Sequence, residues 1–73
     1  MKVYRIKIDG TGSGYVRGVL ISTEKGFETI VTHDKNDAAW YEEDKAKVYC
    51  EELNNQSIKE NFKLEEVENN EEK

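Results

Sequence analysis

Proline is absent from this chain of 73 residues, and cysteine occurs once, as Cys50. Without proline there is no signal for a rigid linker between domains. A lone cysteine cannot close a disulfide within the chain, whereas small secreted domains usually need several, so we expect a reducing, cytoplasmic compartment. Apolar residues never approach the run of about 20 that spans a membrane, and no apolar stretch typical of a signal peptide follows Met1. We therefore expect no membrane partner.

Apolar side chains are also scarce, at 36% of the chain against 37% charged, where globular domains usually have about 45–50% apolar residues. A chain of this length makes at most one domain, and its core is thin. Residues 68–73 carry no apolar side chain. This predicts a disordered acidic tail behind a single domain of residues 1–67.

The net charge of −5 is unevenly distributed along the chain. Residues 1–33 carry five Lys or Arg and three Asp or Glu, whereas residues 34–73 carry six and thirteen. An acidic half disfavours tight, non-specific binding to nucleic acid, because such binding depends on neutralising phosphates. It is compatible with a protein partner that has a basic surface.

Three strands are predicted in the first half of the chain. Residues 2–8 alternate between charged and apolar side chains, which is the period of a half-buried strand. Residues 15–22 and 27–32 are rich in β-branched and aromatic side chains, and glycine-containing turns precede both. Gly18 lies inside the second of these runs and suggests a bulge. The short connections predict an antiparallel meander.

The pattern then changes from strand to helix. Ala46, Tyr49, Cys50 and Leu53 have the spacing of one helix face, which predicts a helix over about 43–53. Trp40 lies off that face, so residues 38–41 are interpreted as a docking segment or short strand. A single helix over 37–53 is the alternative. Asn54 and Asn55 are a plausible C-terminal stop, and the alternation in residues 61–67 predicts a last strand.

The predicted fold class is therefore α+β, an antiparallel sheet of three to four strands in the order β-β-β-α-β with one helix packed on one face. Ten residues are the predicted core: Tyr4, Ile6, Ile8, Leu20, Trp40, Ala46, Tyr49, Leu53, Phe62 and Leu64.

Motifs that carry chemistry are weak in this sequence. The glycine-rich residues 10–14 match neither common phosphate-loop spacing, and a strand rather than a helix is predicted to follow, so a hairpin turn is the favoured interpretation. His33 is the only histidine, and its neighbour Asp34 would point to the opposite face of a strand. Cys50 lies on the apolar helix face and is expected to be a small buried hydrophobe. We expect no enzyme, no cofactor and no metal site.

Carboxylates on or beside the predicted helix are the most abundant candidate contact residues: Glu42, Glu43, Asp44, Glu51 and Glu52. A solvated and ion-paired helix face explains such residues in most proteins. The functional interpretation is an acidic surface that binds a basic groove. Lys45 and Lys47 weaken this interpretation, because they interrupt the field of one sign.

Tyr15 and Tyr41 are candidate anchors for a protein interface, where aromatic residues are enriched. The alternative is that they are half-buried with solvated hydroxyls. The outer strand of the meander offers another contact, because an exposed sheet edge can pair with a partner strand or with a second copy of the chain.

The sequence of these segments has a familiar arrangement. Asp-Ala-Ala-Trp-Tyr at 37–41 precedes the predicted helix, and Phe-Lys-Leu-Glu-Glu-Val at 62–67 closes the pattern. Over residues 15–67 the chain resembles the small uncharacterised accessory proteins carried by phages and prophages of Gram-positive bacteria. The resemblance implies a binder that inhibits or redirects a host protein, including a host defence nuclease. Those proteins share no common activity, so no functional residue is carried over.

We expect a small non-enzymatic protein-binding module that acts by steric occlusion through its acidic surface. The resemblance implies that this module is a phage-encoded inhibitor or modulator of a host protein. One alternative is a self-associating structural protein that forms a homodimer. The other is a nucleic-acid-binding module that uses the basic residues near the first three strands: Lys2, Arg5, Lys7, Arg17 and Lys25.

Overall fold

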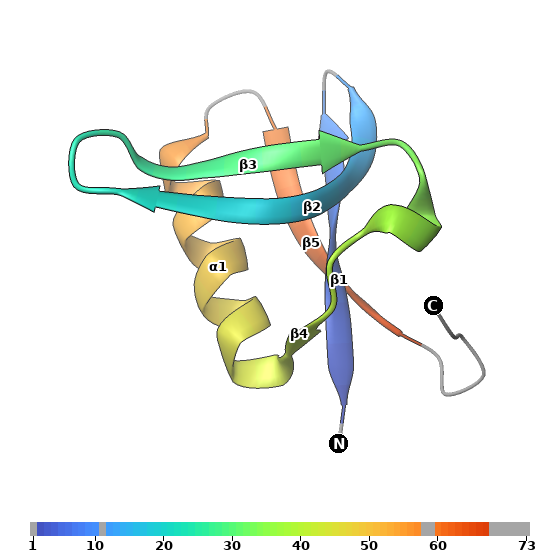
Figure 1. Cartoon of the computed structure of the whole chain (residues 1–73). Coiled ribbons are helices and arrows are strands. Elements are labelled where there is room, and N and C mark those ends of the chain that lie inside the picture. The colour runs from blue at the N-terminus through green and yellow to red at the C-terminus, as the bar shows by residue number, and fades with distance from the viewer. Residues whose placement is uncertain (1, 11, 58–59, 68–73) are drawn as a thin grey trace.

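The computed structural model describes residues 2–10, 12–57 and 60–67. Within them the chain forms an antiparallel five-stranded sheet with one helix packed against it, which confirms the α+β fold class (Figure 1). The expected tail, residues 68–73, lies outside the described residues. The elements in chain order are β1 Val3–Gly10, β2 Ser13–Ser22, β3 Gly26–Thr32, the short 3-10 turn η1 Lys35–Asp37, β4 Tyr41–Glu42, α1 Glu43–Gln56 and β5 Glu60–Glu66.

Strand β1 lies at the centre of the sheet. Along one edge it pairs with β5, from Tyr4 to Gly10. Along the other edge it pairs with β4 near its start and with β2 near its end. Strands β2 and β3 form a long hairpin that crosses in front of β1 and β5 and projects past α1 (Figure 1). The strands with an unpaired outer side are therefore β3, β5 and the two-residue β4.

A β-bulge in β2 decides which hairpin side chains reach the core. Val16 pairs with Val31 and Gly18 pairs with Ile30, so Arg17 is an extra residue in the ladder. The extra residue reverses the alternation beyond it. Val19 consequently packs on the core, whereas Leu20 is 52% exposed. The prediction that Leu20 is a core residue is wrong for this reason.

The core is a small cluster between the sheet and α1. Its buried members are Ile6, Ile8, Val16, Cys50, Leu53 and Phe62. Partly buried residues complete it from the hairpin, β4, α1 and β5: Val19, Phe27, Tyr41, Tyr49 and Leu64. Most of the predicted core is confirmed here, because the period of the strands and of the helix places those residues on the inward faces.

Two predicted core residues lie half-buried outside that cluster, Tyr4 and Trp40. The hydroxyl of Tyr4 donates a hydrogen bond to Glu43 at 2.9 Å, which keeps the ring near the solvent boundary. In the segment around Trp40, a small residue is more deeply buried than the tryptophan itself. Ala38 is fully buried, and the amide of Ala39 donates to the carbonyl of Val16 at 3.1 Å.

The separation of a short docking strand from the helix is confirmed, since β4 ends at Glu42 and α1 begins at Glu43. The helix continues to Gln56, beyond the predicted stop at Asn54 and Asn55. Among the described residues only Gly26 has a positive φ, so neither Asn adopts the left-handed conformation on which the predicted stop depended.

Arg5 lies on the face of β1 that the alternation assigned to solvent, yet it is 2% exposed. Its guanidinium forms an ion pair with Glu65, the residue directly opposite on β5. The guanidinium carbon also lies 5.8 Å from the centre of the Tyr15 ring. Because strands flank β1 on both sides, neighbouring side chains cover this face as well, and a single-strand pattern does not show that.

Candidate functional site

The five acidic residues singled out from the sequence occupy the start and the middle of α1. Glu42, Asp44 and Glu51 are exposed, while Glu52 is half-buried. Glu43 is also half-buried, because it accepts the Tyr4 hydrogen bond and lies 3.9 Å from the ammonium of Lys47. The five carboxylates therefore do not form one uniform contact surface.

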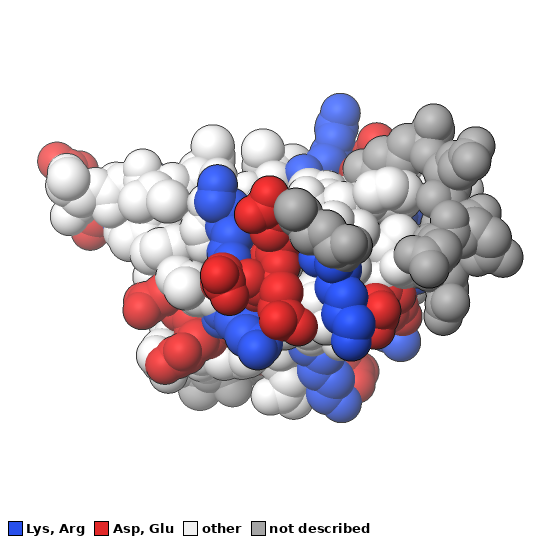
Figure 2. Space-filling view, turned by 90° about the horizontal axis from the view of Figure 1, so that it is seen from below, with Lys and Arg blue, Asp and Glu red and all other residues white. Residues whose placement is uncertain are grey.

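The charge pattern on this side of the molecule is mixed. Figure 2 shows acidic side chains beside Lys and Arg side chains, with no extended area of a single sign. Lys2 lines the same shallow hollow as Glu42, Glu43 and Asp44. A surface of alternating sign produces a weaker field at a distance than a surface of one sign.

Tyr15 and Tyr41 are both half-buried and engaged within the fold. Tyr15 lies against Arg5. Tyr41 packs edge-to-face on Tyr49 with ring centres 5.2 Å apart, and burial raises the pKa of its hydroxyl. Both residues thus contribute to packing, and little of either ring is free to anchor a partner.

Basic residues of the first three strands are largely committed to ion pairs. Arg5 is buried against Glu65. Arg17 lies 3.4 Å from Asp37, and Lys25 lies 4.0 Å from Glu28. Three of the five basic residues of this segment thus lie close to a carboxylate, which reduces the positive charge that it offers to phosphates.

Groups that could carry catalysis are dispersed. Among the described residues no group of three or more His, Cys, Asp or Glu could hold a metal ion. His33 is exposed just after β3. Cys50 is buried, its thiol donates a hydrogen bond to the carbonyl of Phe62 at 3.0 Å, and burial raises its pKa although the hydrogen bond from Asn54 opposes this. A thiol with a raised pKa is a poor nucleophile.

Within the residues that the structure describes, no helix has the length and apolar character to cross a membrane.

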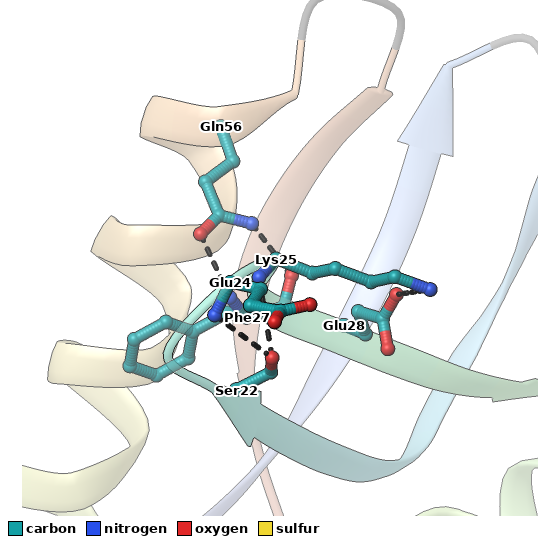
Figure 3. A network of polar contacts seen from close by, with 6 residues as sticks. All are labelled: Ser22, Glu24, Lys25, Phe27, Glu28 and Gln56. Atoms are coloured by element: carbon teal, nitrogen blue, oxygen red, sulfur yellow. Dashed lines mark hydrogen bonds and ion pairs between the residues drawn. The ribbon is translucent and has the colours of Figure 1, made fainter.

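Side-chain amides in the C-terminal turns of α1 bind the outer edges of the two long edge strands, β3 and β5, and we call each of these contacts a clamp. Gln56 accepts a hydrogen bond from the amide of Phe27 on β3 at 2.8 Å and donates to its carbonyl at 2.6 Å (Figure 3). Asn54 does the same for Phe62 on β5, at 2.7 and 2.9 Å. Each amide mimics one residue of a neighbouring strand, so the helix joins the two ends of the sheet.

Between these two clamped edges lies a shallow hollow. Leu53 and Phe62 are its buried lining, and Thr29 and Glu60 line it from β3 and β5. The hollow lies where β3 and β5 approach each other without pairing. From there the outer edge of β3 continues beyond the clamp at Phe27.

Exposed large aliphatic residues are concentrated on the β2–β3 hairpin. Among the described residues, four of the five are on these two strands: Leu20, Ile21, Ile30 and Val31. The fifth is Val48 on α1. Leu20 and Ile30 share one face of the hairpin, whereas Ile21 and Val31 are on the opposite face. We call Leu20 and Ile30 the aliphatic patch. On the face seen in Figure 2, the projecting end of the molecule is mostly uncharged, and acidic side chains appear at its tip.

Sequence reasoning considered an exposed sheet edge but did not select these four residues. A signal was present, because Leu20 with Ile21 and Ile30 with Val31 are consecutive apolar pairs. Neighbours in a strand point to opposite faces. In a small sheet with one core, one member of each pair must therefore point away from the core. The exposure of the second members, Ile21 and Val31, has no such signal in the sequence.

No family model matches this chain, and neither a curated protein nor a solved structure shows significant similarity to it.

Proposed function

We propose that this protein is a small non-enzymatic protein-binding module that acts by occupying a surface of another protein, with the aliphatic patch of the β2–β3 hairpin as its contact. The observation that carries the proposal is the concentration of exposed aliphatic side chains on two adjacent strands that project beyond the core. Single exposed aliphatic residues are common, whereas contiguous apolar patches mark interaction sites.

The outer face of the hairpin supplies the centre of the contact. Leu20 pairs with Glu28 and Gly18 pairs with Ile30, so Leu20 and Ile30 are diagonal neighbours on one face. Gly18 adds no side chain between them. Complete burial of an aliphatic side chain of this size stabilises a complex by about 1.5–3 kcal/mol. The partner that fits this face is a protein with an apolar groove or strand face.

The acidic surface of α1 is a second candidate contact, supported by the exposure of Glu42, Asp44 and Glu51. Such charges chiefly accelerate encounter with a basic partner and contribute less to the affinity. The resemblance to phage accessory proteins that bind host proteins supports a binding role for either surface. Nucleic acid is a weaker candidate, since three of the five basic residues near the first three strands, Arg5, Arg17 and Lys25, lie close to carboxylates.

Immobilised full-length protein, incubated with bacterial lysate, tests the two surfaces through matched variants. Leu20→Lys is compared with Val48→Lys, a control at a similarly exposed aliphatic residue on α1. We expect a specific bound protein to be lost with Leu20→Lys, kept with Val48→Lys and retained at high salt.

A second variant replaces all five carboxylates with Ser: Glu42, Glu43, Asp44, Glu51 and Glu52. Loss of the bound protein with this variant and at high salt, but not with Leu20→Lys, would transfer the function to the acidic surface. Binding that survives both sets of substitutions, or recovery of nucleic acid alone, would refute the proposed function.

A further inference from the structure

The outer edge of β3 exposes backbone groups at defined positions. The amide and carbonyl of Phe27 point away from β2, because both bind Gln56. Alternate residues of an antiparallel strand direct these groups to the same side. Thr29 and Val31 therefore also point outwards, and β3 has no bulge between them. Within the described chain, no hydrogen bond satisfies these outward groups.

The second sheet edge differs in charge. β5 carries a charged residue at most of its positions: Glu60, Lys63, Glu65 and Glu66. Charged side chains on an edge strand discourage pairing with another chain. The part of β3 beyond the clamp instead reads Thr29-Ile30-Val31, and Glu28 is the only charged residue of the strand. The edge of β3 is thus the one suited to accept another strand.

We propose that a second copy of this chain pairs with β3 in antiparallel orientation, with Ile30 on the twofold axis. In this register Thr29 of each copy forms a hydrogen-bonded pair with Val31 of the other. Ile30 faces Ile30 of the second copy as a non-hydrogen-bonded pair. All outward groups of Thr29 and Val31 then find partners in one step.

A second copy fits this edge better than an unrelated strand, because the available segment is short and symmetric about Ile30. On one side the Gln56 clamp already occupies Phe27, and on the other side β3 ends at Thr32. A longer foreign strand would displace the clamp. Two identical segments instead satisfy each other, as an isologous interface requires.

Charge also favours this pairing. A chain with a net charge of −5 can contact itself only where carboxylates do not meet. In the proposed register Glu28 lies opposite Thr32 of the second copy, and the central pairs are uncharged. Pairs of β-branched residues across strands are favourable. The pairing rests on the proposed function and extends it. It joins the faces that carry Leu20 and Ile30 in the two copies into one aliphatic strip.

Disulfide trapping tests the register directly. In a Cys50→Ala background, Ile30→Cys would place two thiols on residues whose Cα atoms are about 4.5 Å apart, a separation that a disulfide spans. Val48→Cys in the same background is the matched control, with 54% exposure against 43% for Ile30. We expect Ile30→Cys to form a linked dimer at least about tenfold faster, because pairing raises the effective concentration. Equal rates for the two variants would overturn the proposal.

Light scattering on the unmodified chain measures the association itself. We expect the mass to rise from 8.5 kDa towards twice that value between about 10 µM and about 1 mM, since a contact of modest area dissociates in that range. Thr29→Pro removes an outward amide without removing a β2–β3 hydrogen bond, and proline is tolerated on such edges. Ile30→Lys places two ammonium groups together at the axis. Both variants are expected to remain monomeric, with circular dichroism confirming the fold.

A chain that stays monomeric over this range, or dimers that persist in both folded variants, would refute the pairing. Neither result affects the lysate experiment with Leu20→Lys, because Leu20 lies on β2, away from the paired edge. Failure of the dimer and failure of the proposed function are therefore separate outcomes.

Discussion

The hydrogen bonds between Gln56 and Phe27 predict that substitutions at Gln56 and at Gly26, the first residue of β3, have non-additive effects on the free energy of unfolding. Gly26 has φ of 72°, and a Cβ atom built there would lie 2.5 Å from Oε1 of Gln56. Gly26→Ala therefore has two costs. The left-handed conformation is unfavourable for alanine by about 1–2 kcal/mol. In addition, the Gln56 side chain must move, so it loses both hydrogen bonds to Phe27.

Gln56→Ala alone measures the second cost. Two hydrogen bonds to neutral groups at a site that water can reach are worth about 1–2 kcal/mol together. Gly26→Ala should then destabilise the native chain by about 2–4 kcal/mol, but by only about 1–2 kcal/mol when Gln56 is already alanine. The sum of the two single effects is expected to exceed the effect of the double variant by about 1–2 kcal/mol.

Urea unfolding of the four proteins at low concentration, followed by fluorescence of the single tryptophan, gives these free energies. For a chain of this size, 1 kcal/mol corresponds to a shift in melting temperature of about 4–8 °C. Asn55→Ala, at an exposed amide on the same turn, controls for helix propensity. Effects that add within about 0.3–0.5 kcal/mol would show that the clamp and the glycine act independently, and would refute this reasoning.

Two further predictions concern buried charge and pH. Glu65→Ala leaves the Arg5 guanidinium buried without its carboxylate, so urea unfolding should show a free energy of unfolding lower by about 2–4 kcal/mol. The double variant Arg5→Met with Glu65→Leu should lose less, and a loss below about 0.5 kcal/mol for Glu65→Ala would contradict the pairing. The pKa values of Tyr4 and Tyr41 are raised, the first chiefly by its hydrogen bond to Glu43 and the second chiefly by burial. The folded chain thus retains protons that the unfolded chain releases, and this stabilisation is complete below pH 10 and lost as the pH rises through the folded-state values. In a pH titration, phenolate absorbance should show a component that ionises above pH 10, and Tyr4→Phe should reduce it. Simultaneous ionisation of every tyrosine near pH 10 would refute the prediction.

Local sequence patterns were sufficient to predict most of the strands and the helix of this fold. Alternation in residues 2–8 and the spacing of Ala46, Cys50 and Leu53 were confirmed as a strand and a buried helix face. The position of Trp40 off that face correctly separated the docking strand from the helix. These features depend on the strand and helix periods alone, so residues close in sequence carry the information.

Errors arose where a distant segment decided the outcome. The bulge at Arg17 turned Leu20 outwards, although Gly18 had signalled a bulge, because which residue becomes the extra one depends on pairing with β3. Arg5 was buried by Tyr15 and Glu65, which come from the strands on either side of β1.

The sequence by itself determined the order of strands and helix, the acidic second half and the absence of recognisable catalytic motifs, because composition and local period carry that information. Only the tertiary structure decided that Asn54 and Gln56 clamp opposite ends of the sheet and that the edge of β3 beyond Phe27 stays open. A side-chain amide gives no sequence signal for the backbone it will bind. The hydrogen bond between Phe27 and Gln56 joins residues 29 positions apart, so it depends on how the sheet and the helix pack together.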